Sequence, residues 1–557
     1  MTGAEVVVEV LKREGATTIF GYPGGMALPL YDALYESGIR HILTRHEQGA
    51  AHAADGYARS TGKVGVCITT SGPGATNLVT GIATANIDSI PMVCITCQVP
   101  RAAIGKDSFQ EADIRGITTP ITKHNYLVSD PEELAKVLRQ AFYVARTGRP
   151  GVVVVDVPKD LFLAEIQPDF EEDITMEAYH PTYEGDLKEV ETAASLMAAA
   201  KKPVFFVGGG ANDKSSALLF RKLVEKTGIP VVNSLMGVSV YPNDEPLHLG
   251  MLGMHGTVPA NRAVCDCDLL IGIGVRFADR VTGNVHNFAK NAKIVQFEID
   301  PVEIDKTVKI DARVLADLQW SLTKLLEIVK KPKIKAWQDT VKKWKAEKPI
   351  VYGKAKGEEI KPQKVIETIS QLTEGEAVVV TDVGQHQMWS ALLYQSKIPR
   401  SFLSSGGLGT MGYGLPAAIG AQIGREKEEV WVFIGDGGFL MNCQEMATAV
   451  EHHLPIKVIV LNNRCLGMVQ QWQRLFFNGH MSHSQFHIDT NFAKLAEAFG
   501  AGAQRVTERK DLEAALREAQ KAKEPYLVEV MVTPDENVYP MVPAGASLEE
   551  MMEWSEF

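Results

Sequence analysis

The sequence predicts an α/β protein built from three doubly wound parallel-sheet domains. Short apolar runs alternate with helical patterns along the whole chain, which is typical of parallel sheets covered by helices. At about 150 residues per domain, the length of 557 residues corresponds to three or four compact units. Ligands of such sheets bind beyond the carboxyl ends of the strands, so the turns that follow the apolar runs are the first candidate sites.

The first predicted domain covers residues 1–166. Its apolar runs predict strands at Thr18–Phe20, Ile39–Leu43, Val64–Thr69, Met92–Ile95 and Val152–Val155. Each run ends in a polar or glycine-rich turn, in the order GYPGG, RHEQGA, TSGPGATN, CQVP and DVPKD. An acidic, proline-containing stretch at residues 167–186 then predicts a linker.

Two further domains follow the linker. The central domain, residues 187–329, has predicted strands at Val204–Val207, Val231–Asn233, Leu269–Ile273 and Ile294–Ile299. Residues 330–361 are rich in lysine and predict a second linker that carries some helix. The third domain, residues 362–557, has predicted strands at Val378–Thr381, Ser401–Ser404, Val430–Ile434, Val458–Leu461 and Tyr526–Val532. The first and third domains look alike, because both have polar turns at their strand ends.

Composition excludes several classes of protein. The net charge is −11 and no dense basic stripe occurs, which argues against nucleic-acid binding. No apolar run reaches the ~18 residues of a membrane span. The first helical stretch carries Glu5, Glu9 and Lys12 instead of the apolar core of a signal peptide, so we expect a cytoplasmic protein. Cys94 and Cys97 form a C-x-x-C motif beside an apolar run, and we interpret them as reduced core residues.

Residues 430–469 carry the most informative motif. One strand ends in Gly435-Asp436-Gly437-Gly438, a helical segment follows, and the next strand ends in Asn462-Asn463. Asp436 and Asn463 are 463 − 436 = 27 residues apart, the length of one strand–helix–strand crossover, so both should lie at the same sheet edge. A carboxylate, an amide and a backbone carbonyl suit Mg²⁺. The glycines allow backbone N–H groups to approach a diphosphate.

The central domain contains a weaker motif. Gly208–Gly210 directly follows a strand, and a later strand has an acidic end at Glu298, which together suggest dinucleotide binding. A dehydrogenase is one interpretation of this pattern. It needs a hydride-accepting site, and the rest of the sequence supplies no candidate for one.

The combination of GDG with NN resembles the diphosphate–magnesium motif of thiamine-diphosphate (ThDP) enzymes. That family places a glutamate at the aminopyrimidine of the cofactor, and Glu47 in RHEQGAAHAADGYAR matches it. Alone, Glu47 would be a glutamate favoured by a helix dipole. Together with the metal motif, we interpret it as the pyrimidine partner. Met411 in GGLGTMGYGLPAAIGA matches the bulky apolar residue that supports the bent cofactor.

Nearly the whole chain resembles the catalytic subunits of the acetolactate synthase (acetohydroxyacid synthase) family. The matching stretches include GYPGG, SGPGATN, FQEADIRGIT, PITKHNYLV, RPGVVVVDVPKD, MLGMHGT, GVRFADRVTG, VGQHQMW, GDGGF, LGMVQQWQ and NVYPMVPAGASLEEMM. LGMVQQWQ together with VPKD and MLGMHGT separates this family from pyruvate oxidases and simple decarboxylases. The sequence departs from the family pattern at Cys97, where glycine is usual, and at Ala278, where an acidic residue is usual.

The resemblance implies a reaction between two 2-ketoacids in branched-chain amino acid biosynthesis. Pyruvate is decarboxylated on ThDP, and the hydroxyethyl unit condenses with pyruvate to give 2-acetolactate or with 2-ketobutyrate to give 2-aceto-2-hydroxybutyrate. Glu47 is implied to activate ThDP, while Asp436, Asn463 and the Cys465 carbonyl bind Mg²⁺. The implied substrate region contains Phe109, Gln110 and Lys159. The other implied residues of the ThDP site are Gly25, Gln385, His386, Gly409, Met411, Gly437, Gly438 and Met468.

Trp472 is the expected selector of the second substrate. Its indole can pack on the extra methyl group of 2-ketobutyrate, a contact of ~1 kcal/mol. The alternative is an aromatic residue that only fills an interface.

The family further implies FAD in a structural role without a redox step. The FAD residues carried over are Arg149, Gly208, Gly209, Gly210, Leu235, Met236, His255, Gly274, Arg276, Arg280, Glu298 and Asp317. It also implies a homodimer or tetramer in which the glutamate and the diphosphate domain of one site come from different subunits. A small regulatory subunit is a further implied partner.

Three alternatives remain open at this point. A pyruvate oxidase-like enzyme would reduce its flavin when pyruvate is added. A glyoxylate carboligase-like enzyme would lack the pyrimidine glutamate, which RHEQ retains. A catalytically silent FAD-binding partner subunit is the third alternative, and the presence of Glu47, Asp436 and Asn463 argues against it.

Overall fold

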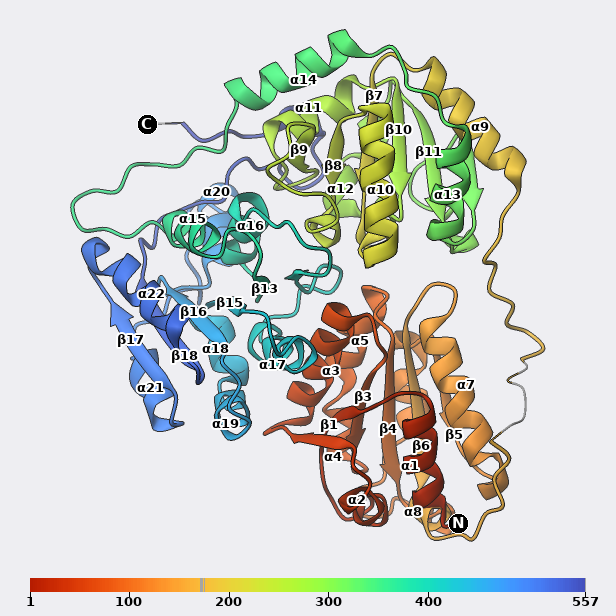
Figure 1. Ribbon diagram of the computed structural model, residues 1–557. Coiled ribbons are helices and arrows are strands. Elements are labelled where there is room, and N and C mark those ends of the chain that lie inside the picture. The colour runs from red at the N-terminus through yellow and green to blue at the C-terminus, as the bar shows by residue number, and fades with distance from the viewer. Residues whose placement is uncertain (171–173, 175, 556–557) are drawn as a thin grey trace.

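Three parallel sheets organise the protein. The computed structural model describes residues 1–170, 174 and 176–555, and over these residues each of the three domains contains a six-stranded sheet. The first domain lies at the lower right of Figure 1, the central domain at the top and the third domain at the left. The predicted fold class of three doubly wound α/β domains is confirmed. Residues 171–173 and 175 of the first predicted linker lie outside the described part of the chain.

The first domain has the strand order β2-β1-β3-β4-β6-β5. Every residue of β3, β4 and β6 is buried, which explains why these strands appear in the sequence as continuous apolar runs. The strands are β1 (Thr18–Tyr22), β2 (Arg40–Leu43), β3 (Gly65–Thr69), β4 (Met92–Gln98), β5 (His124–Leu127) and β6 (Val152–Pro158). The helices are α1 (Gly3–Arg13), α2 (Leu28–Tyr35), α3 (Glu47–Thr61), α4 (Pro73–Thr76), α5 (Val79–Ile87), α6 (Ile114–Thr118), α7 (Leu134–Arg146) and α8 (Lys159–Phe162).

The third domain repeats this topology, with the order β14-β13-β15-β16-β18-β17. Counted within each domain, both orders are 2-1-3-4-6-5, so the predicted likeness of the first and third domains is confirmed. The strands are β13 (Val378–Thr381), β14 (Phe402–Leu403), β15 (Val430–Gly435), β16 (Lys457–Asn462), β17 (Gly502–Val506) and β18 (Tyr526–Met531). The helices are α15 (Pro362–Leu372), α16 (Gln385–Leu393), α17 (Gly414–Gly424), α18 (Asp436–Asn442), α19 (Glu445–Glu451), α20 (Gly467–Phe476), α21 (Phe492–Ala498) and α22 (Leu512–Lys521).

The central domain has a different order, β12-β11-β10-β7-β8-β9. Read from the β9 edge, with the strands numbered 1 to 6 within the domain, this order is 3-2-1-4-5-6. The chain reverses its direction of winding between β7 and β10. The strands are β7 (Pro203–Val207), β8 (Val231–Asn233), β9 (His248–Met251), β10 (Leu269–Ile273), β11 (Lys293–Glu298) and β12 (Ala312–Leu315). The helices are α9 (Leu187–Ala199), α10 (Lys214–Thr227), α11 (Val258–Asp266), α12 (Asp279–Thr282), α13 (Leu318–Ile328) and α14 (Lys335–Glu347).

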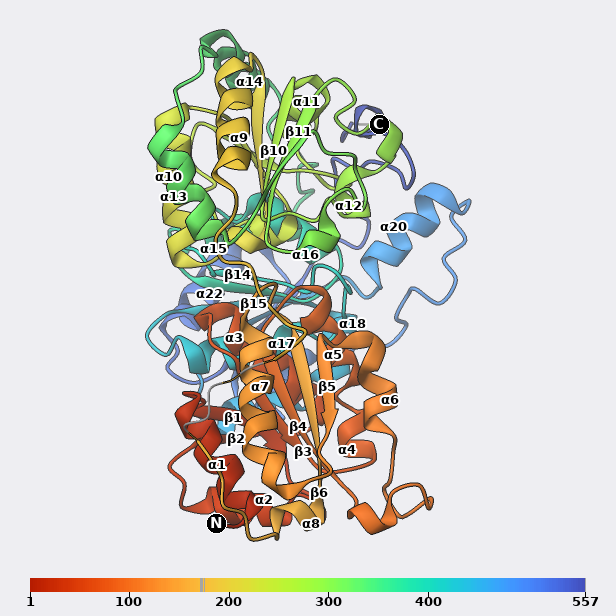
Figure 2. The same ribbon diagram turned by 90° about the vertical axis from the view of Figure 1, so that its right-hand side faces the viewer.

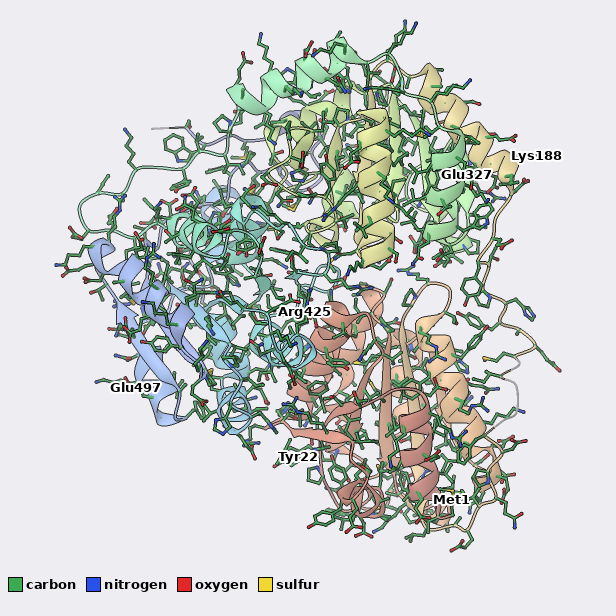
Figure 3. All side chains as sticks on the ribbon, in the orientation of Figure 1. Met1, Tyr22, Lys188, Glu327, Arg425 and Glu497 are labelled. Atoms are coloured by element: carbon green, nitrogen blue, oxygen red, sulfur yellow. The ribbon has the colours of Figure 1, made fainter. Side chains whose placement is uncertain are left out.

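Two segments from outside the predicted central domain also pack on it. Helix α14, from the second predicted linker, buries Trp337 and Val341 in the central core, and Val542 and Leu548 from the C-terminal segment join the same core. Helices α9 and α13, which carry the labelled residues Lys188 and Glu327 in Figure 3, lie beside each other on the sheet.

The strands that the sequence analysis did not predict are all at sheet edges. They are β5, β9, β12 and β17, and each is the outermost strand of its sheet. Residues of β5, β12 and β17 are largely half-buried or exposed, and β9 contains His248 and Gly250. The other two edge strands, β2 and β14, overlap predicted runs. An edge strand has one side without a neighbouring strand and therefore tolerates polar residues, so an apolar run need not mark it in the sequence.

The first and third domains meet through equivalent helices. α3 and α17 each follow the second strand of their domain, and they pack closely because glycine faces backbone at two points. A Cβ on Gly56 would overlap the backbone of Ala417, and a Cβ on Gly420 would overlap the carbonyl of Ala53. Arg59 of α3 is buried, pairs with Asp55 and with Asp88, and donates to the Ser404 carbonyl at 2.8 Å.

A second contact joins all three domains. Arg425, labelled in Figure 3 where the domains approach one another, donates to the carbonyl of Arg400 at 3.0 Å. The Arg400 N–H donates to Asn212 Oδ1 of the central domain at 2.9 Å, and its guanidinium donates to the carbonyl of Arg59 at 3.0 Å.

The cysteines are free thiols. Cys94 faces the core beneath α3, where its Sγ lies 3.2 Å from Cys67 Sγ, whereas Cys97 belongs to the core on the other face of the sheet. The C-x-x-C pair therefore points to opposite faces, as expected for a spacing of three in a strand. No group of three or more His, Cys, Asp or Glu residues in the described residues is arranged to hold a metal ion. Within the same residues, no helix combines the length and the apolar surface needed to cross a membrane.

Candidate active site

Glu47 is the first residue of α3 and lies at the carboxyl edge of the first sheet. The ring of His46 caps the helix, with Nδ1 accepting from the Gln48 N–H at 3.1 Å. The Glu47 carboxylate is half-buried and accepts a hydrogen bond from Asn77 Nδ2 at 2.9 Å. Asn77 follows the turn after β3, so residues that follow two different strands, β2 and β3, fix this carboxylate.

Gln110 lies on the other side of the same turn. It has a φ of 61°, and its carbonyl oxygen would come within 2.7 Å of a Cβ on Gly72. Gly74 in this turn faces Glu47, since a Cβ there would lie 3.4 Å from Glu47 Oε1. The structure thus brings Glu47 and Gln110 to one turn, although they are far apart in sequence. Phe109, beside Gln110, is 82% exposed in the single chain.

Lys159 and Gly25 lie at the same sheet edge. Lys159 begins α8 after β6, and its neighbour Asp160 pairs with Arg101 at 2.7 Å, which ties this turn to the loop that carries Phe109 and Gln110. Gly25 is exposed in the turn after β1, and no atom lies within 4 Å of the position that its Cβ would take.

Asp436 begins α18 at the carboxyl end of β15 and is 3% exposed. Its Oδ1 accepts from the Gly437 N–H at 2.9 Å, whereas its buried Oδ2 has no hydrogen-bond partner among the described residues. Burial raises the pKa of Asp436 to about 7, although backbone N–H groups, including those of Arg464 and Cys465, act to lower it. The carboxylate therefore faces the loop after β16, as the crossover spacing predicts.

The loop after β16 presents the other two predicted metal ligands. Asn463 Oδ1 accepts from the Cys465 N–H at 3.2 Å, and the intervening Arg464 has a φ of 56°. Glu529 of β18 supports this loop by accepting from Asn462 Nδ2 at 2.8 Å. The corner between the carboxyl ends of β15 and β16 therefore offers oxygens of a carboxylate, an amide and backbone carbonyls. These are the ligand types that Mg²⁺ prefers.

Gln385 and His386 enter the same corner from the start of α16. Gln385 Nε2 donates to Gln471 Oε1 at 2.9 Å and to the carbonyl of Glu536 at 2.7 Å. The His386 ring packs on Gly435, where a Cβ would lie 3.4 Å from it. Burial lowers the pKa of His386 to about 4, so the ring is neutral, and its buried Nε2 has no partner within the described part of the chain.

The glycines of this corner pack tightly against neighbouring side chains. A Cβ on Gly438 would overlap the carboxylate of Asp382, and a Cβ on Gly437 would lie 2.7 Å from Leu466 Cδ2. A Cβ on Gly467 would overlap Gln385 Oε1 and lie 2.8 Å from Asn463 Nδ2. Substitution at any of them would displace one of the polar groups or the loop that carries them.

Met411 lies in the loop before α17, and Asp382 holds that loop. The Asp382 carboxylate accepts from the N–H groups of Gly412 at 2.9 Å and Gly414 at 2.8 Å. Burial raises the pKa of Asp382 to about 6, while these hydrogen bonds act to lower it. Gly409 in this loop has a φ of 68°, a conformation that favours glycine.

Met468 and Trp472 lie on α20, which projects from the body of the protein in Figure 2. The rings of Trp472 and Phe476 meet edge to face with centroids 6.2 Å apart. Trp472 Nε1 is buried without a hydrogen-bond partner among the described residues. Val469, Phe476 and Phe477 are apolar residues exposed on this segment of the single chain.

The glycine-rich turns of the central domain meet at its switch point. Gly208–Gly210 follows β7 and Gly274 follows β10, the two adjacent strands between which the winding reverses. A Cβ on Gly210 would lie 2.9 Å from Gly274 Cα, so the two turns are in contact. The strand order 3-2-1-4-5-6 and a glycine turn at this point are typical of dinucleotide-binding sheets. Gly209 faces Met236, with 3.1 Å from its Cβ position to Met236 Cβ.

A cavity of about 610 Å³ opens between the first and central domains. Arg149 and Arg276 line it, together with Ile299, Asp300 and Leu408. Arg149 donates to Glu303 Oε1 at 2.7 Å and pairs with Asp300 at 3.1 Å. Beside the cavity, Glu298 Oε1 accepts from the Ile299 and Asp300 N–H groups at 2.9 and 3.2 Å, and burial raises its pKa to about 7.

The remaining residues of the implied FAD set are more dispersed. Arg280 is largely exposed and pairs with Asp279 at 3.4 Å, and Asp317 caps α13 by accepting from the Gln319 N–H at 2.8 Å. His255 is buried, its Nδ1 has no partner among the described residues, and burial lowers its pKa to about 4. Leu235 and Met236 are half-buried beside the glycine turns.

Sequence reasoning missed several residues that shape these sites. Asn77, Asp382 and Glu529 each hold a predicted site residue or its loop by hydrogen bonds. Asp382 directly follows a predicted strand and Asn77 lies in the SGPGATN turn. The expectation that ligands bind beyond the carboxyl ends of strands could therefore have identified both. Glu529 lies inside an apolar strand, where a buried carboxylate was the only signal.

The comparisons with known proteins agree with this arrangement. Residues 1–117, 190–325 and 382–530 match the families described as thiamine pyrophosphate enzyme N-terminal TPP binding domain, central domain and C-terminal TPP binding domain. The chain is 47% identical to an acetolactate synthase large subunit of Corynebacterium glutamicum, over 98% of this chain and 89% of that protein. It is 45% identical to the acetolactate synthase large subunit of Lactococcus lactis, over 99% and 96% of the two chains. It is 46% identical to acetolactate synthase 1, chloroplastic, of Nicotiana tabacum, over 99% and 84%. The chain therefore belongs to the acetolactate synthase large-subunit family of thiamine pyrophosphate enzymes.

Proposed function

We propose that this chain decarboxylates pyruvate and joins the remaining two-carbon unit to a second 2-ketoacid. With pyruvate as acceptor the product is 2-acetolactate, and with 2-ketobutyrate it is 2-aceto-2-hydroxybutyrate. The observation that carries the proposal is the buried Asp436 Oδ2, which has no hydrogen-bond partner among the described residues and belongs to a carboxylate that faces the Asn463–Cys465 loop. A buried carboxylate oxygen without a partner is costly, and a cation removes that cost.

The residues of this corner fit a magnesium diphosphate. Asp436, Asn463 and the Cys465 carbonyl would hold Mg²⁺, while Gln385, His386 and the α18 N-terminus would face the diphosphate. ThDP, when bound, supplies the carbon nucleophile and the electron sink that decarboxylation of a 2-ketoacid requires. Met411, on the loop held by Asp382, would support the bent cofactor.

Glu47 would exchange a proton with the pyrimidine ring. Its carboxylate is half-buried and is oriented by Asn77 alone among the described hydrogen bonds, so one oxygen remains available. Gln110 and Lys159 lie at the same sheet edge and would bind the carboxylate or keto oxygen of the substrate. Trp472 would pack on the acceptor and favour 2-ketobutyrate.

FAD is the second cofactor that we propose, in a structural role. The glycine turns at the switch point and the cavity lined by Arg149 and Arg276 support an adenine dinucleotide at this place. Because neither step of the proposed reaction changes an oxidation state at the flavin, we expect it to stay oxidised when pyruvate is added.

The proposed assembly is a homodimer or tetramer with shared active sites, together with a small regulatory subunit. The exposed apolar residues of α20 support a second copy as neighbour. The relatives are named large subunits, which supports a smaller partner. We also propose a cytoplasmic location, because the seven cysteines are all free thiols.

A mixed-dimer experiment tests both the catalytic residues and the sharing of sites. We expect Glu47→Gln alone to lower acetolactate formation by ~10²-fold or more, because the amide cannot exchange the proton. Asp436→Ala alone should remove the metal site. A dimer with one subunit of each variant should recover about half of the wild-type activity, because one of its two shared sites is then complete.

Two outcomes would contradict the proposal. Near wild-type activity of Glu47→Gln would remove Glu47 from the mechanism. Inactive mixed dimers would mean that Glu47 and Asp436 act within one chain. Flavin content measured on each variant controls for folding of the central domain.

A further inference from the structure

The third domain of each chain holds the segment that leads into Glu47. Glu445, the first residue of α19, accepts the N–H of Arg45 with Oε1 at 3.1 Å and with Oε2 at 3.2 Å. Arg45 is two residues before Glu47, and the contact spans 400 positions of the sequence. A carboxylate from one domain therefore binds the backbone at the entry to the helix that begins with Glu47.

The surroundings of Glu445 fix its carboxylate in one position. The residue is 0% exposed, and Thr448 Oγ1 donates to its Oε2 at 2.7 Å. Gly49 of α3 lies directly against it, since a Cβ at Gly49 would come within 2.5 Å of Oε1. Three hydrogen bonds orient the carboxylate, and a larger residue at Gly49 would have to displace it.

The other end of α19 binds the same residue in a different way. Glu451, the last residue of α19, pairs with the Arg45 guanidinium at the surface. An exposed ion pair of this kind contributes little to stability. Glu445 and Glu451 therefore form a natural matched pair, one buried and bound to backbone, the other exposed and bound to the side chain.

Docking of the two domains does not require a buried carboxylate at this point. The glycine-mediated packing of α3 on α17 and the buried Arg59 network already join the first and third domains. Burial of a carboxylate is costly and raises the pKa of Glu445 to about 7. What this carboxylate holds is the backbone at the start of α3.

We propose that Glu445 is a positioning residue for Glu47 of its own chain, an inference that rests on the proposed function. Asp436 and Glu445 are 445 − 436 = 9 residues apart, at the starts of the consecutive helices α18 and α19. In a dimer with shared sites, the third domain of one chain holds its own cofactor through Asp436. The same domain shapes the neighbouring active site through Glu445, Arg45 and Glu47. Consecutive helices thus belong to two different active sites.

The first test separates kcat from cofactor binding. We expect Glu445→Gln to lower kcat about tenfold, because a shift of the catalytic carboxylate by a fraction of an ångström is enough for such a loss. The KM for ThDP and Mg²⁺ and the flavin content should stay unchanged, since the corner around Asp436 is intact. Glu451→Gln, at the other end of the same helix, should leave kcat unchanged.

Gly49→Ala provides a second variant that alters no functional group. Its methyl group would push the Glu445 carboxylate from Arg45, so kcat should fall as in Glu445→Gln. A drop in kcat for Glu451→Gln equal to that for Glu445→Gln would contradict the proposal. So would a rise in the KM for ThDP with kcat unchanged in Glu445→Gln.

Mixed dimers then identify which active site Glu445 serves. A subunit carrying both Glu47→Gln and Glu445→Ala, paired with a wild-type subunit, should keep about half of the wild-type activity, because both changes fall in one site. With the two substitutions on different subunits, both sites are affected and activity should be far lower. If activity is instead low with both substitutions on one subunit and about half with the substitutions on different subunits, Glu445 acts on the active site that contains Asp436 of its own chain. That result would overturn the proposal.

Failure of the proposed function gives a different result. If Glu47→Gln dimers keep wild-type activity, Glu47 has no catalytic role and no positioning effect can be measured on it. If Glu47→Gln is inactive as expected but Glu445→Gln is not impaired, only the positioning role is rejected. Circular dichroism and flavin content of each purified dimer confirm that loss of activity is not loss of fold.

Discussion

The first and third domains have the same strand order, and yet they offer different chemistry at equivalent turns. After the third strand, the first domain has Gly72–Gly74 and the third domain has Gly435–Gly437. Both turns lead into a helix at the carboxyl edge of the sheet. Only the third domain has a carboxylate in this turn, Asp436, with a buried oxygen that lacks a partner in the described residues. The shared strand order therefore determines where a ligand can bind, and single residues in the turns determine which chemical group of a ligand can bind there.

The second and fourth strand ends show the same division. After the second strand, α3 begins with Glu47 in the first domain, whereas the third domain has the loop of Met411 before α17. After the fourth strand, the first domain continues into the loop of Phe109 and Gln110, and the third domain into the loop of Asn463 followed by α20. Neither domain contains a full set of groups for the proposed reaction. The proposed catalysis therefore needs the carboxyl edge of one first domain and that of one third domain.

The largest effect is expected where the two equivalent turns differ most. Asp436→Ala should abolish Mg²⁺-dependent ThDP binding and lower activity by ~10³-fold or more, because no other carboxylate is available in that turn. Calorimetric titration with ThDP and Mg²⁺ measures the binding. Asp535→Ala, which removes an exposed carboxylate paired with Arg474 at 2.9 Å, is the control and should bind normally. Normal binding by Asp436→Ala would mean that the two turns do not differ in function.

The contact between the equivalent helices α3 and α17 should be the next most sensitive feature. Gly420→Ala places a methyl group on the carbonyl of Ala53, so we expect a loss of about 2 kcal/mol from overpacking. Thermal unfolding followed by circular dichroism should show a lower Tm. Gly353→Ala is the control, because its Cβ would meet only Trp554 at 3.6 Å. An unchanged Tm for Gly420→Ala would show that the two domains are not held by this contact.

The smallest effect concerns the segments after the fourth strands. Trp472→Leu should reduce the preference for 2-ketobutyrate over pyruvate as acceptor by about fivefold, the value of one methyl contact. The ratio of the two products from mixed substrates measures this preference. Phe476→Leu, on the same helix and in ring contact with Trp472, should change the ratio less. A constant ratio in Trp472→Leu would assign Trp472 to packing.

The sequence was sufficient for the strands in the middle of each sheet. β3, β4 and β6 are buried on both faces, so their apolar runs are unbroken and the pattern is local. The edge strands β5, β9, β12 and β17 escaped prediction because one side of each has no strand neighbour and their residues are mixed. Packing of α14 and of Val542 on the central core depends on distant contacts and has no local signature.

The candidate sites divide in the same way. Asp436 and Asn463 were found from their spacing, since one crossover returns both to the same edge. The sequence did not predict that one turn brings Gln110 and Glu47 together. This depends on the packing of Gly72 against Gln110, which is 110 − 72 = 38 residues later in the chain.

The sequence by itself determined the chemical groups, the strand ends that carry them and the family of the chain, because each depends on residues close together in the sequence. Only the tertiary structure decided which strand ends meet and which residues hold them. Glu445 is the clearest case, since its contact with Arg45 joins positions 400 residues apart and leaves no periodicity or motif behind. The physical reason is that spacing along a chain fixes neighbours within a crossover, whereas contacts between domains arise from shape and burial across the whole fold.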